Sequence, residues 1–273
     1  MTTVAGKVFT IPPGLAFVDA LAAHLLAEAD GDPLRLAEME VLLPNRRACR
    51  SAREAFLRLS GGKPLLLPRM RAIDAGDEGD ALLFADGPLD IPPAIPPIER
   101  HLLLTRLVLA MGSGRGGHTP TPDQAARLAA ELAALLDAVQ IERIGFDRLS
   151  TLVPEDYAAH WQVTLDFLKI VTEHWPALLG DRLDPQERVN RVLDAQARRL
   201  RDDPPDTPVI AAGSTWRAAT ADLIKVISRL PKGRVVLPGL DLSMDADTWA
   251  ALDDSHPQFG MKWLLDRLGV ERR

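Results

Sequence analysis

Four arginines in the first third of the sequence have the spacing that an anion-binding surface needs. Arg46, Arg50 and Arg53 recur at i, i+4 and i+7, so a helix would place them on one face, with Arg47 beside it. Guanidinium groups in such a row can bind the phosphates of a DNA backbone or the acidic surface of a partner protein. A solvated helix face, balanced by Glu54 and by charges elsewhere, fits the same pattern. We treat the four arginines as candidate contacts to a DNA backbone, and both interpretations stay open.

The helix that carries these arginines is predicted to begin after Asn45, a favourable N-cap residue, and to end near Ser60. Its apolar residues fall on a different side, which we expect to face a core: Cys49, Ala52, Phe56 and Leu59. Further cations extend the positive charge along the chain: Arg58, Lys63, Arg69 and Arg71.

A second place where chemistry could occur follows the first predicted strand, at the usual position of a phosphate loop. A working loop needs glycines for close backbone approach, a lysine for the phosphates, and a hydroxyl group for magnesium. The segment Ile11–Phe17 has one glycine, Gly14, and neither lysine nor hydroxyl. Pro12 and Pro13 also remove two backbone N–H donors. We therefore predict a degenerate nucleotide loop at Pro12, Pro13 and Gly14, and no catalytic residue in the chain.

The remaining motifs are weaker. Gly112–Gly117 matches the letters of a dinucleotide fingerprint, but a predicted helix precedes it where the fingerprint needs a strand. The six histidines show no metal-ligand spacing, so we predict no metal site. Ser214 follows a predicted strand but lacks the second glycine of a nucleophile elbow, and Asp241 has no partner acid, base or ligand nearby in the sequence.

The predicted elements alternate between strand and helix at both ends of the chain, which indicates an α/β fold with a parallel sheet. In the first part, strands are expected at 7–11, 40–44 and 64–68, with helices at 15–29 and 45–60. In the last part, strands are expected at 208–212 and 234–238, with helices at 218–230, 246–252 and 257–268.

The middle of the chain is predicted to be helical. An acidic, glycine- and proline-rich linker over 74–97 leads to helices at about 97–111, 121–140, 161–179 and 185–201. In the second of these, Leu128, Leu132, Leu135, Leu136 and Val139 are expected on one apolar face. The domains we predict are an α/β domain over 1–95 and 205–273, and an inserted helical sub-domain over 96–204.

Composition limits the classes of protein to which the chain can belong. Of 273 residues, 47% are hydrophobic and 26% charged, which is ordinary for a globular protein. No apolar run reaches the length of a transmembrane helix, and the first residues lack a secretory cleavage pattern. The single cysteine fits a reducing compartment, so we expect a cytoplasmic protein without membrane contact. Because the formal net charge is -6, any DNA contact must come from a local cluster of cations.

Several blocks of this sequence together resemble the N-terminal region of the AddB family, in particular its alphaproteobacterial type. The resemblance runs almost from end to end of the chain. The blocks are Val8–Gly14 (VFTIPPG), Val41–Arg50 (VLLPNRRACR) with Arg53–Phe56 (REAF), Lys63–Arg69 (KPLLLPR), His160 and Trp161 with Asp166–Glu173 (DFLKIVTE), Val209–Thr215 (VIAAGST) with Ala219–Leu223 (ATADL), Val235–Asp241 (VVLPGLD) and His256–Gly260 (HPQFG).

The resemblance implies a RecA-like fold of the superfamily-one helicase type, with a phosphate-loop-like sheet domain and an inserted helical domain. It also implies an AddA-type helicase–nuclease subunit as partner, and DNA as the substrate of a complex that processes double-strand breaks for recombinational repair. An active helicase would carry an acidic pair after the strand at 209–212, where this chain has Gly213 and Ser214. The family's nuclease domain, with an iron–sulfur cluster in many members, lies beyond the matching region. We therefore expect no cofactor in this chain and interpret it as a fragment.

Two other classes of function remain open. One is a stand-alone α/β enzyme for a nucleotide or a phosphorylated small molecule, with its site at the carboxyl ends of the strands around Gly14, Gly213 and Asp241. The other is a protein–protein adaptor that does not touch DNA. The absence of a clustered acid, base or metal ligand in the sequence counts against the enzyme.

Overall fold

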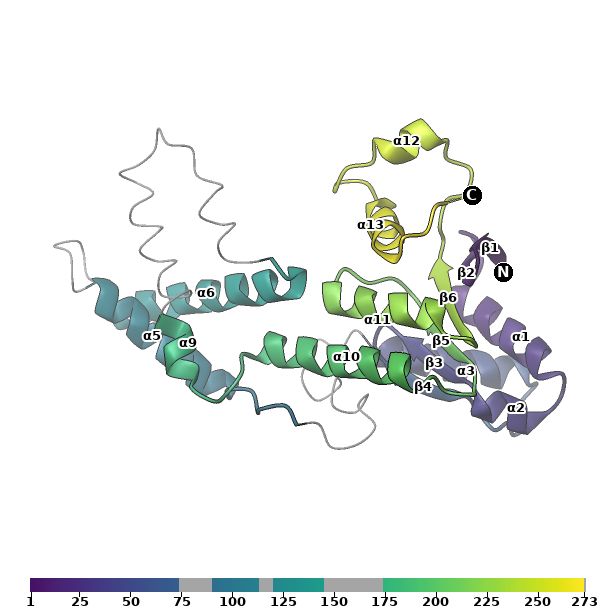
Figure 1. Ribbon diagram of the computed structural model, residues 1–273, viewed down its shortest axis with the longest axis horizontal. Helices are drawn as coiled ribbons and strands as arrows, with labels where there is room; N and C mark the ends of the chain where they lie inside the picture. Colours follow the sequence, from purple (N-terminus) through teal and green to yellow (C-terminus); the bar gives the residue numbers. More distant parts are fainter. Residues whose placement is uncertain (74–89, 113–119, 145–173, 273) are drawn as a thin grey trace. The chain divides into compact units, whose positions relative to one another are not determined.

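A computed structural model describes residues 1–73, 90–112, 120–144 and 174–272 of the chain. The chain divides into two compact units (Figure 1). Unit 1 comprises Met1–Leu89 and Val192–Arg273, and unit 2 comprises Asp90–Arg191. The two units are described separately below.

Unit 1 is an α/β unit with a mixed, mostly parallel sheet in the order β1-β2-β6-β5-β3-β4. Only the pairing of β1 with β2 is antiparallel, and the other four pairings are parallel. The α/β alternation predicted from the sequence is thus confirmed, and β1 is an added edge strand that the sequence did not indicate. The strands are β1 (Thr2–Ala5), β2 (Val8–Ile11), β3 (Glu40–Leu43), β4 (Arg69–Ala72), β5 (Val209–Ala212) and β6 (Gly233–Pro238).

The prediction of a strand at 64–68 is wrong. The corresponding strand in the structure is β4, at Arg69–Ala72. Residues 64–68 contain no regular structure, and Leu66 and Leu67 are exposed. The prolines that bound this segment cannot donate to a strand ladder, while β4 pairs with β3 over its whole length, from Glu40↔Arg69 to Leu43↔Ala72. As an edge strand without an apolar pattern, β4 gives no hydrophobic signal in the sequence.

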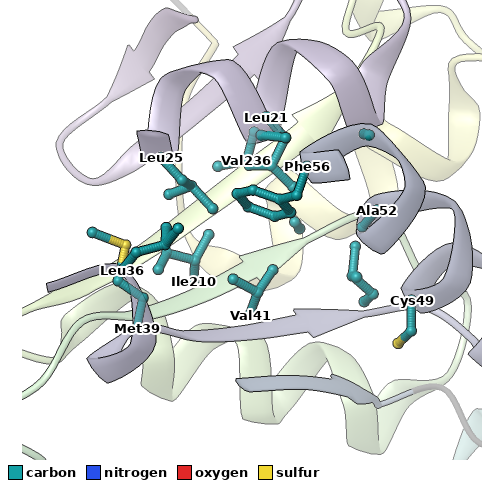
Figure 2. Close-up of a cluster of buried hydrophobic side chains, with 14 of the residues drawn as sticks. Leu21, Leu25, Leu36, Met39, Val41, Cys49, Ala52, Phe56, Ile210 and Val236 are labelled. Atoms are coloured by element: carbon teal, nitrogen blue, oxygen red, sulfur yellow. The ribbon is translucent and has the colours of Figure 1, made fainter. Parts of the chain in front are cut away.

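Helices cover both faces of this sheet. α1 and α3 pack together over one face, where Leu21, Leu25 and Phe56 meet strand residues such as Val41 and Ile210 (Figure 2). The alternate strand residues point to the opposite face, against which α11 packs, and α13 packs on α11. The helices of this unit are α1 (Phe17–Ala29), α2 (Pro33–Glu38), α3 (Arg46–Leu59), α11 (Ala218–Arg229), α12 (Ala246–Ala250), α13 (Phe259–Leu268) and the last part of α10 (Pro185–Asp202).

In its described residues, unit 2 consists mainly of helices, with one isolated β-bridge between Ala94 and Leu183. Its helices are α5 (Pro97–Gly112), α6 (Pro122–Glu142), α9 (Trp175–Leu179) and the first part of α10. α5 and α6 pack along each other around a buried cluster that includes Leu104, Leu132 and Leu136. Of the predicted third helix, Trp175 and Leu179 lie on α9, while Trp161, Leu165 and Leu168 fall outside the described residues.

The apolar face predicted for α6 needs a correction. Leu132, Leu136 and Val139 are buried as expected, but Leu128 is 44% exposed and Leu135 is 36% exposed. Two alanines, Ala125 and Ala129, take their places at the buried interface with fully covered side chains. Small residues allow two helices to approach closely, so the packing of α6 against α5 selects an alanine-containing face that hydrophobicity alone ranks lower.

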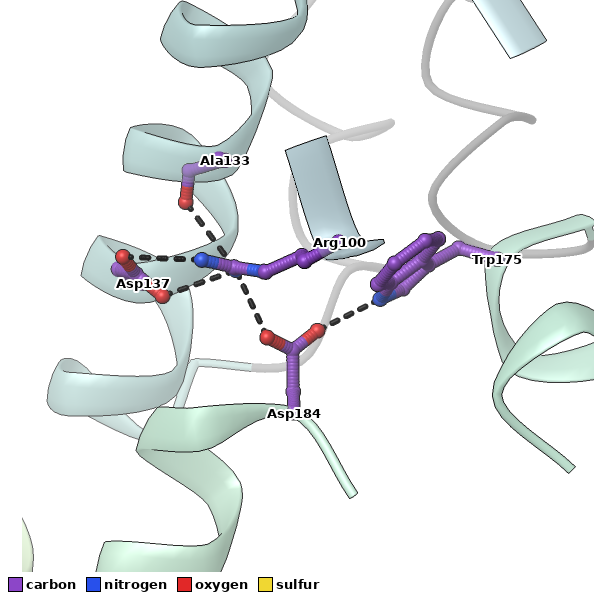
Figure 3. A network of polar contacts seen from close by, with 5 residues as sticks. All are labelled: Arg100, Ala133, Asp137, Trp175 and Asp184. Carbon is purple, nitrogen blue, oxygen red and sulfur yellow. Dashed lines mark hydrogen bonds and ion pairs between the residues drawn. The ribbon is translucent and has the colours of Figure 1, made fainter. Parts of the chain in front are cut away.

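A buried polar network holds unit 2 together (Figure 3). The side chain of Asp184 is fully buried, and its carboxylate accepts a hydrogen bond of 2.6 Å from the indole nitrogen of Trp175. The guanidinium of Arg100 forms ion pairs with Asp184 at 2.7 Å and with Asp137 at 2.9 Å. Burial raises the pKa of Asp184 above its ordinary value, and the attraction of Arg100 opposes this effect without cancelling it.

Candidate functional site

Four loops meet at one edge of the sheet in unit 1, because the carboxyl ends of parallel strands lie together. They follow β2, β3, β5 and β6, and they contain Pro12, Pro13, Gly14, Gly213, Ser214 and Asp241, while the four candidate arginines lie on α3, which begins after the loop of β3. Open α/β sheets bind their ligands at this edge. We therefore take the carboxyl edge of the sheet as the candidate functional site and examine its loops in turn.

The loop after β2 has the position of a phosphate loop but lacks the groups that bind phosphate. Pro12 and Pro13 offer no N–H, and the N–H of Leu15 donates back to the carbonyl of Pro12 at 3.4 Å. Gly14 has a φ of +91°, which makes the turn into α1 possible. The first turn of α1 contains Asp19, a carboxylate that offers no donor to a phosphate group. This loop therefore lacks the donor groups with which a phosphate loop holds a nucleotide.

Asp19 is also engaged, since it forms an ion pair of 2.5 Å with Arg58 of α3. In the same way, Arg71 on β4 pairs with Glu40 on β3 at 3.3 Å. The predicted extension of positive charge beyond the four arginines is therefore partly neutralised by acidic neighbours. Both partners of the Arg58 pair are more than one third exposed, so we expect only a small contribution of this pair to stability.

The loop after β5 is built around a close contact. Gly213 lies directly against the ring of Pro44, at the end of the neighbouring strand β3. The N–H of Arg217 donates to the hydroxyl of Thr215 at 3.0 Å, which shapes the turn into α11. At the two positions after the strand, where an active helicase would place acidic residues, Gly213 and Ser214 supply no carboxylate that could hold a magnesium ion.

The loop after β6 uses its carboxylate for its own folding. Asp241 accepts hydrogen bonds from the N–H of Ser243 at 2.8 Å and from its hydroxyl at 2.7 Å. These bonds, the hydroxyl first, lower the pKa of Asp241 below its ordinary value. Gln258 closes the same loop by accepting from the N–H of Asp241 and donating to the carbonyl of Gly239. Asp241 is therefore a structural turn residue in this conformation.

The helix after β3 presents the arginine face that the sequence predicts. The side chain of Asn45 caps α3 by accepting from the N–H of Ala48 at 2.9 Å, so the predicted N-cap is confirmed. The side chains on the arginine face are all exposed: Arg46, Arg47, Arg50 and Arg53. The opposite face buries Cys49, Ala52, Ala55 and Phe56. The prediction was wrong for Leu59, which is 45% exposed because α3 ends at this residue.

The position of these arginines on α3 is electrostatically unusual. Arg46 and Arg47 occupy the first turn, which contains no acidic residue, next to the positive end of the helix dipole. A cation at this end costs a helix roughly 0.3–1 kcal/mol. Among the described residues, none forms an ion pair with Arg47, Arg50 or Arg53. An anion bound here would remove this repulsion, so the face is suited to phosphate groups.

One exposed residue at this edge carried no sequence signal. Trp216, in the loop after β5, is 53% exposed and packs against Phe259 and Trp263 of α13. The sequence places it between a strand and a helix without any periodic pattern, so its exposure depends on where α13 packs. A tryptophan in the short loop between a predicted strand and a predicted helix is the only hint that could have drawn attention to it.

The described residues give no indication of a metal or membrane site. Across the described ranges, no three His, Cys, Asp or Glu side chains lie close enough together to hold a metal ion. Cys49 is free and buried, as predicted from its side of the helix. No helix in the described part of the chain is both long enough and apolar enough to cross a membrane. Gly112–Gly117 and His118 lie in or next to a segment that the structure does not describe.

Comparisons with known proteins do not assign the chain to a family. No protein-family model matches the sequence, and no curated protein is significantly similar to it.

Proposed function

We propose that this chain is a non-catalytic, helicase-like region of an AddB-type subunit, and that it contacts DNA within a helicase–nuclease that processes double-strand breaks. In this proposal the sheet of unit 1 is a RecA-like domain, unit 2 is its helical insertion, and an AddA-type subunit supplies ATP-driven movement. The observation that carries the DNA contact is the exposed arginine face of α3, the helix that begins at the carboxyl edge of the sheet.

The strand arrangement supports a RecA-like interpretation. β6 lies between β2, which leads to the degenerate loop, and β5, which leads to Gly213 and Ser214. RecA-like ATPases likewise have one strand between the strand of the phosphate loop and the strand of the acidic pair. The two losses at Pro12–Gly14 and at Gly213–Ser214 thus fall at the two places where such a domain binds ATP and magnesium.

Two features of α3 support DNA over a purely protein partner. Arg46, Arg50 and Arg53 extend over two turns of one face, with Arg47 beside it, so they offer a row of donors rather than one isolated pair. Arg46 and Arg47 also add to the positive potential of the helix end, which favours phosphate oxygens. A backbone contact of this kind requires no specific base sequence.

The first experiment measures binding of the chain to a fluorescent duplex with a single-stranded tail, by anisotropy at 50 and 200 mM salt. Four phosphate contacts would weaken binding by roughly 50- to 150-fold between the two concentrations, because each contact releases counterions. Affinity that does not change with salt, or no binding at 50 mM, would contradict a contact through phosphates.

Charge-reversal variants locate the contact. We expect R46E/R50E to weaken binding at 50 mM salt and to reduce its salt dependence to about tenfold or less, because two contacts are lost. The matched control is R198E/R201E, which makes the same change in net charge at exposed arginines of α10. Equal loss of affinity in both variants would show a nonspecific effect of net charge and would remove the assignment to α3.

A further inference from the structure

Trp216 projects from the carboxyl edge of the sheet while its neighbours in the chain are covered. Its side chain is 53% exposed, whereas Thr215 is 4% and Arg217 is 6% exposed. Among the large hydrophobic side chains that are exposed in the described ranges, Trp216 is the only aromatic one. The short loop between β5 and α11 therefore turns one indole outward and buries the residues on both sides of it.

The indole is supported from beneath by α13. Its ring centroid lies 6.0 Å from that of Phe259 and 6.2 Å from that of Trp263, both at tilts near 30°. Gly260 allows the closest approach, because a Cβ at this position would lie 2.5 Å from the Cζ2 atom of Trp216. The guanidinium of Arg267 lies 5.7 Å from the ring of Trp263 and pairs with Asp222. The position of the indole is thus fixed by packing, although half of its surface is open.

The surroundings of the indole indicate what it could bind. Trp216 follows the carboxyl end of β5, and the arginine face follows the carboxyl end of the adjacent strand β3. The two loops touch where Gly213 lies against Pro44. α3 covers one face of the sheet and α13 lies over the other, but the loop of Trp216 and the start of the arginine row both follow strands that end at the carboxyl edge. Cations and a fixed, half-open aromatic ring at one edge of a sheet can together bind single-stranded nucleic acid, since the cations bind phosphates and the ring stacks on a base.

We propose that Trp216 is a stacking platform for an unpaired nucleobase of a single strand whose phosphates lie along the arginine face of α3. This inference rests on the proposed DNA contact and adds a residue that contacts bases. Stacking alone would also accept a free nucleotide. A strand is favoured because the loop at Pro12–Gly14 lacks phosphate-binding groups, whereas a strand gains contacts at several arginines.

The test compares two fluorescent strands of equal length and charge, an oligo-dT and a strand of abasic sites, at 50 mM salt. We expect the unmodified chain to bind oligo-dT more tightly. W216A should weaken oligo-dT binding by about 5- to 150-fold, the range that loss of one stacked base produces, and leave abasic binding unchanged. W216F should retain affinity within about threefold because it keeps an aromatic face. L34A, at an exposed leucine of α2, is the control.

The outcomes separate this inference from the proposed function. Equal binding of oligo-dT by W216A and by the unmodified chain, with affinity still dependent on Arg46 and Arg50, would overturn the stacking platform and leave the phosphate contact in place. No binding of either strand would overturn both. Displacement of oligo-dT by millimolar thymidine monophosphate would overturn the assignment to a strand and identify a free-nucleotide site.

Discussion

Gly213 and Pro44 touch at the carboxyl edge of the sheet, where β5 and β3 end side by side. A Cβ on Gly213 would lie 2.4 Å from Cγ and 2.8 Å from Cδ of Pro44, and Gly213 has a φ of +141°. This contact sets the distance between the loop that carries Trp216 and the start of the arginine helix. Both the space and the backbone conformation restrict the position to glycine.

We expect Gly213→Ala to destabilise unit 1 by about 3 kcal/mol, from backbone strain and from the overlap with Pro44. The corresponding fall in Tm is about 6–12 °C, measured by circular dichroism. Gly14→Ala is the control, because its φ of +91° is also strained but nothing lies within 4 Å of its Cβ. If the two variants lose equal stability, the contact with Pro44 contributes nothing. Pro44→Ala added to Gly213→Ala should restore part of the loss.

The corrected face of α6 predicts opposite results for two leucines of the same helix. Leu132→Ala should cost about 2–5 kcal/mol, because it leaves a cavity in a fully covered site. Leu128→Ala, at 44% exposure, should change stability by about 0.5 kcal/mol or less. Denaturant unfolding of both variants checks this. Equal costs would mean that Leu128 is covered in solution and that the alanine-containing face is not the buried one.

Asp184 predicts a pH dependence of stability in unit 2. Burial raises the pKa of Asp184 in the folded chain. In the unfolded chain the pKa of an aspartate is about 3.9, so the folded chain binds the proton of Asp184 more firmly. The stabilising contribution of Asp184 is complete below about pH 4 and is lost as pH rises through the raised folded-state pKa. Asp184→Asn cannot ionise but can still accept from Trp175. The Tm of the unmodified chain minus that of the variant should therefore fall between pH 4 and pH 7.

The control for this pH series is Asp123→Asn. The hydroxyl of Thr121 lowers the pKa of Asp123, so any contribution of this exposed carboxylate is lost as pH falls. The two variants should consequently differ from the unmodified chain with opposite dependence on pH. A difference for Asp184→Asn that grows with pH would show that the ion pair with Arg100 outweighs the cost of burial.

ATP with magnesium should leave the Tm of the chain unchanged within about 1 °C. A ligand at 100 times its Kd stabilises a protein by about 2.7 kcal/mol, so a specific nucleotide site would give a clear shift at millimolar ATP. The prolines after β2 and the missing lysine and hydroxyl in the same loop are the reasons to expect none. Repeating the scan with EDTA distinguishes magnesium-dependent binding. A magnesium-dependent rise of several degrees would favour the nucleotide enzyme.

The sequence by itself determined the local elements and the chemistry that is missing from them. Alternating apolar strands and amphipathic helices predicted the α/β unit, and Asn45 marked the start of α3 because its side chain can cap only a helix that begins there. The losses at Pro12–Gly14 and Gly213–Ser214 could be recognised because a missing lysine or carboxylate is a property of residue type. The arginine row could be predicted because helical spacing fixes which side chains share a face.

Only the tertiary structure decided which of these elements meet. The strand that is β4 was predicted at 64–68, five residues too early. The position of this edge strand is set by its pairing with β3, because its own sequence has no apolar pattern. Ala125 and Ala129 replaced two leucines in the core because α5 packs closely against α6. Arg58 is paired with Asp19, and the ring of Trp216 packs against Gly260, both residues far away in the chain. The periodicity of apolar residues describes a single helix or strand. Burial and pairing depend on which other elements the fold places against that helix or strand.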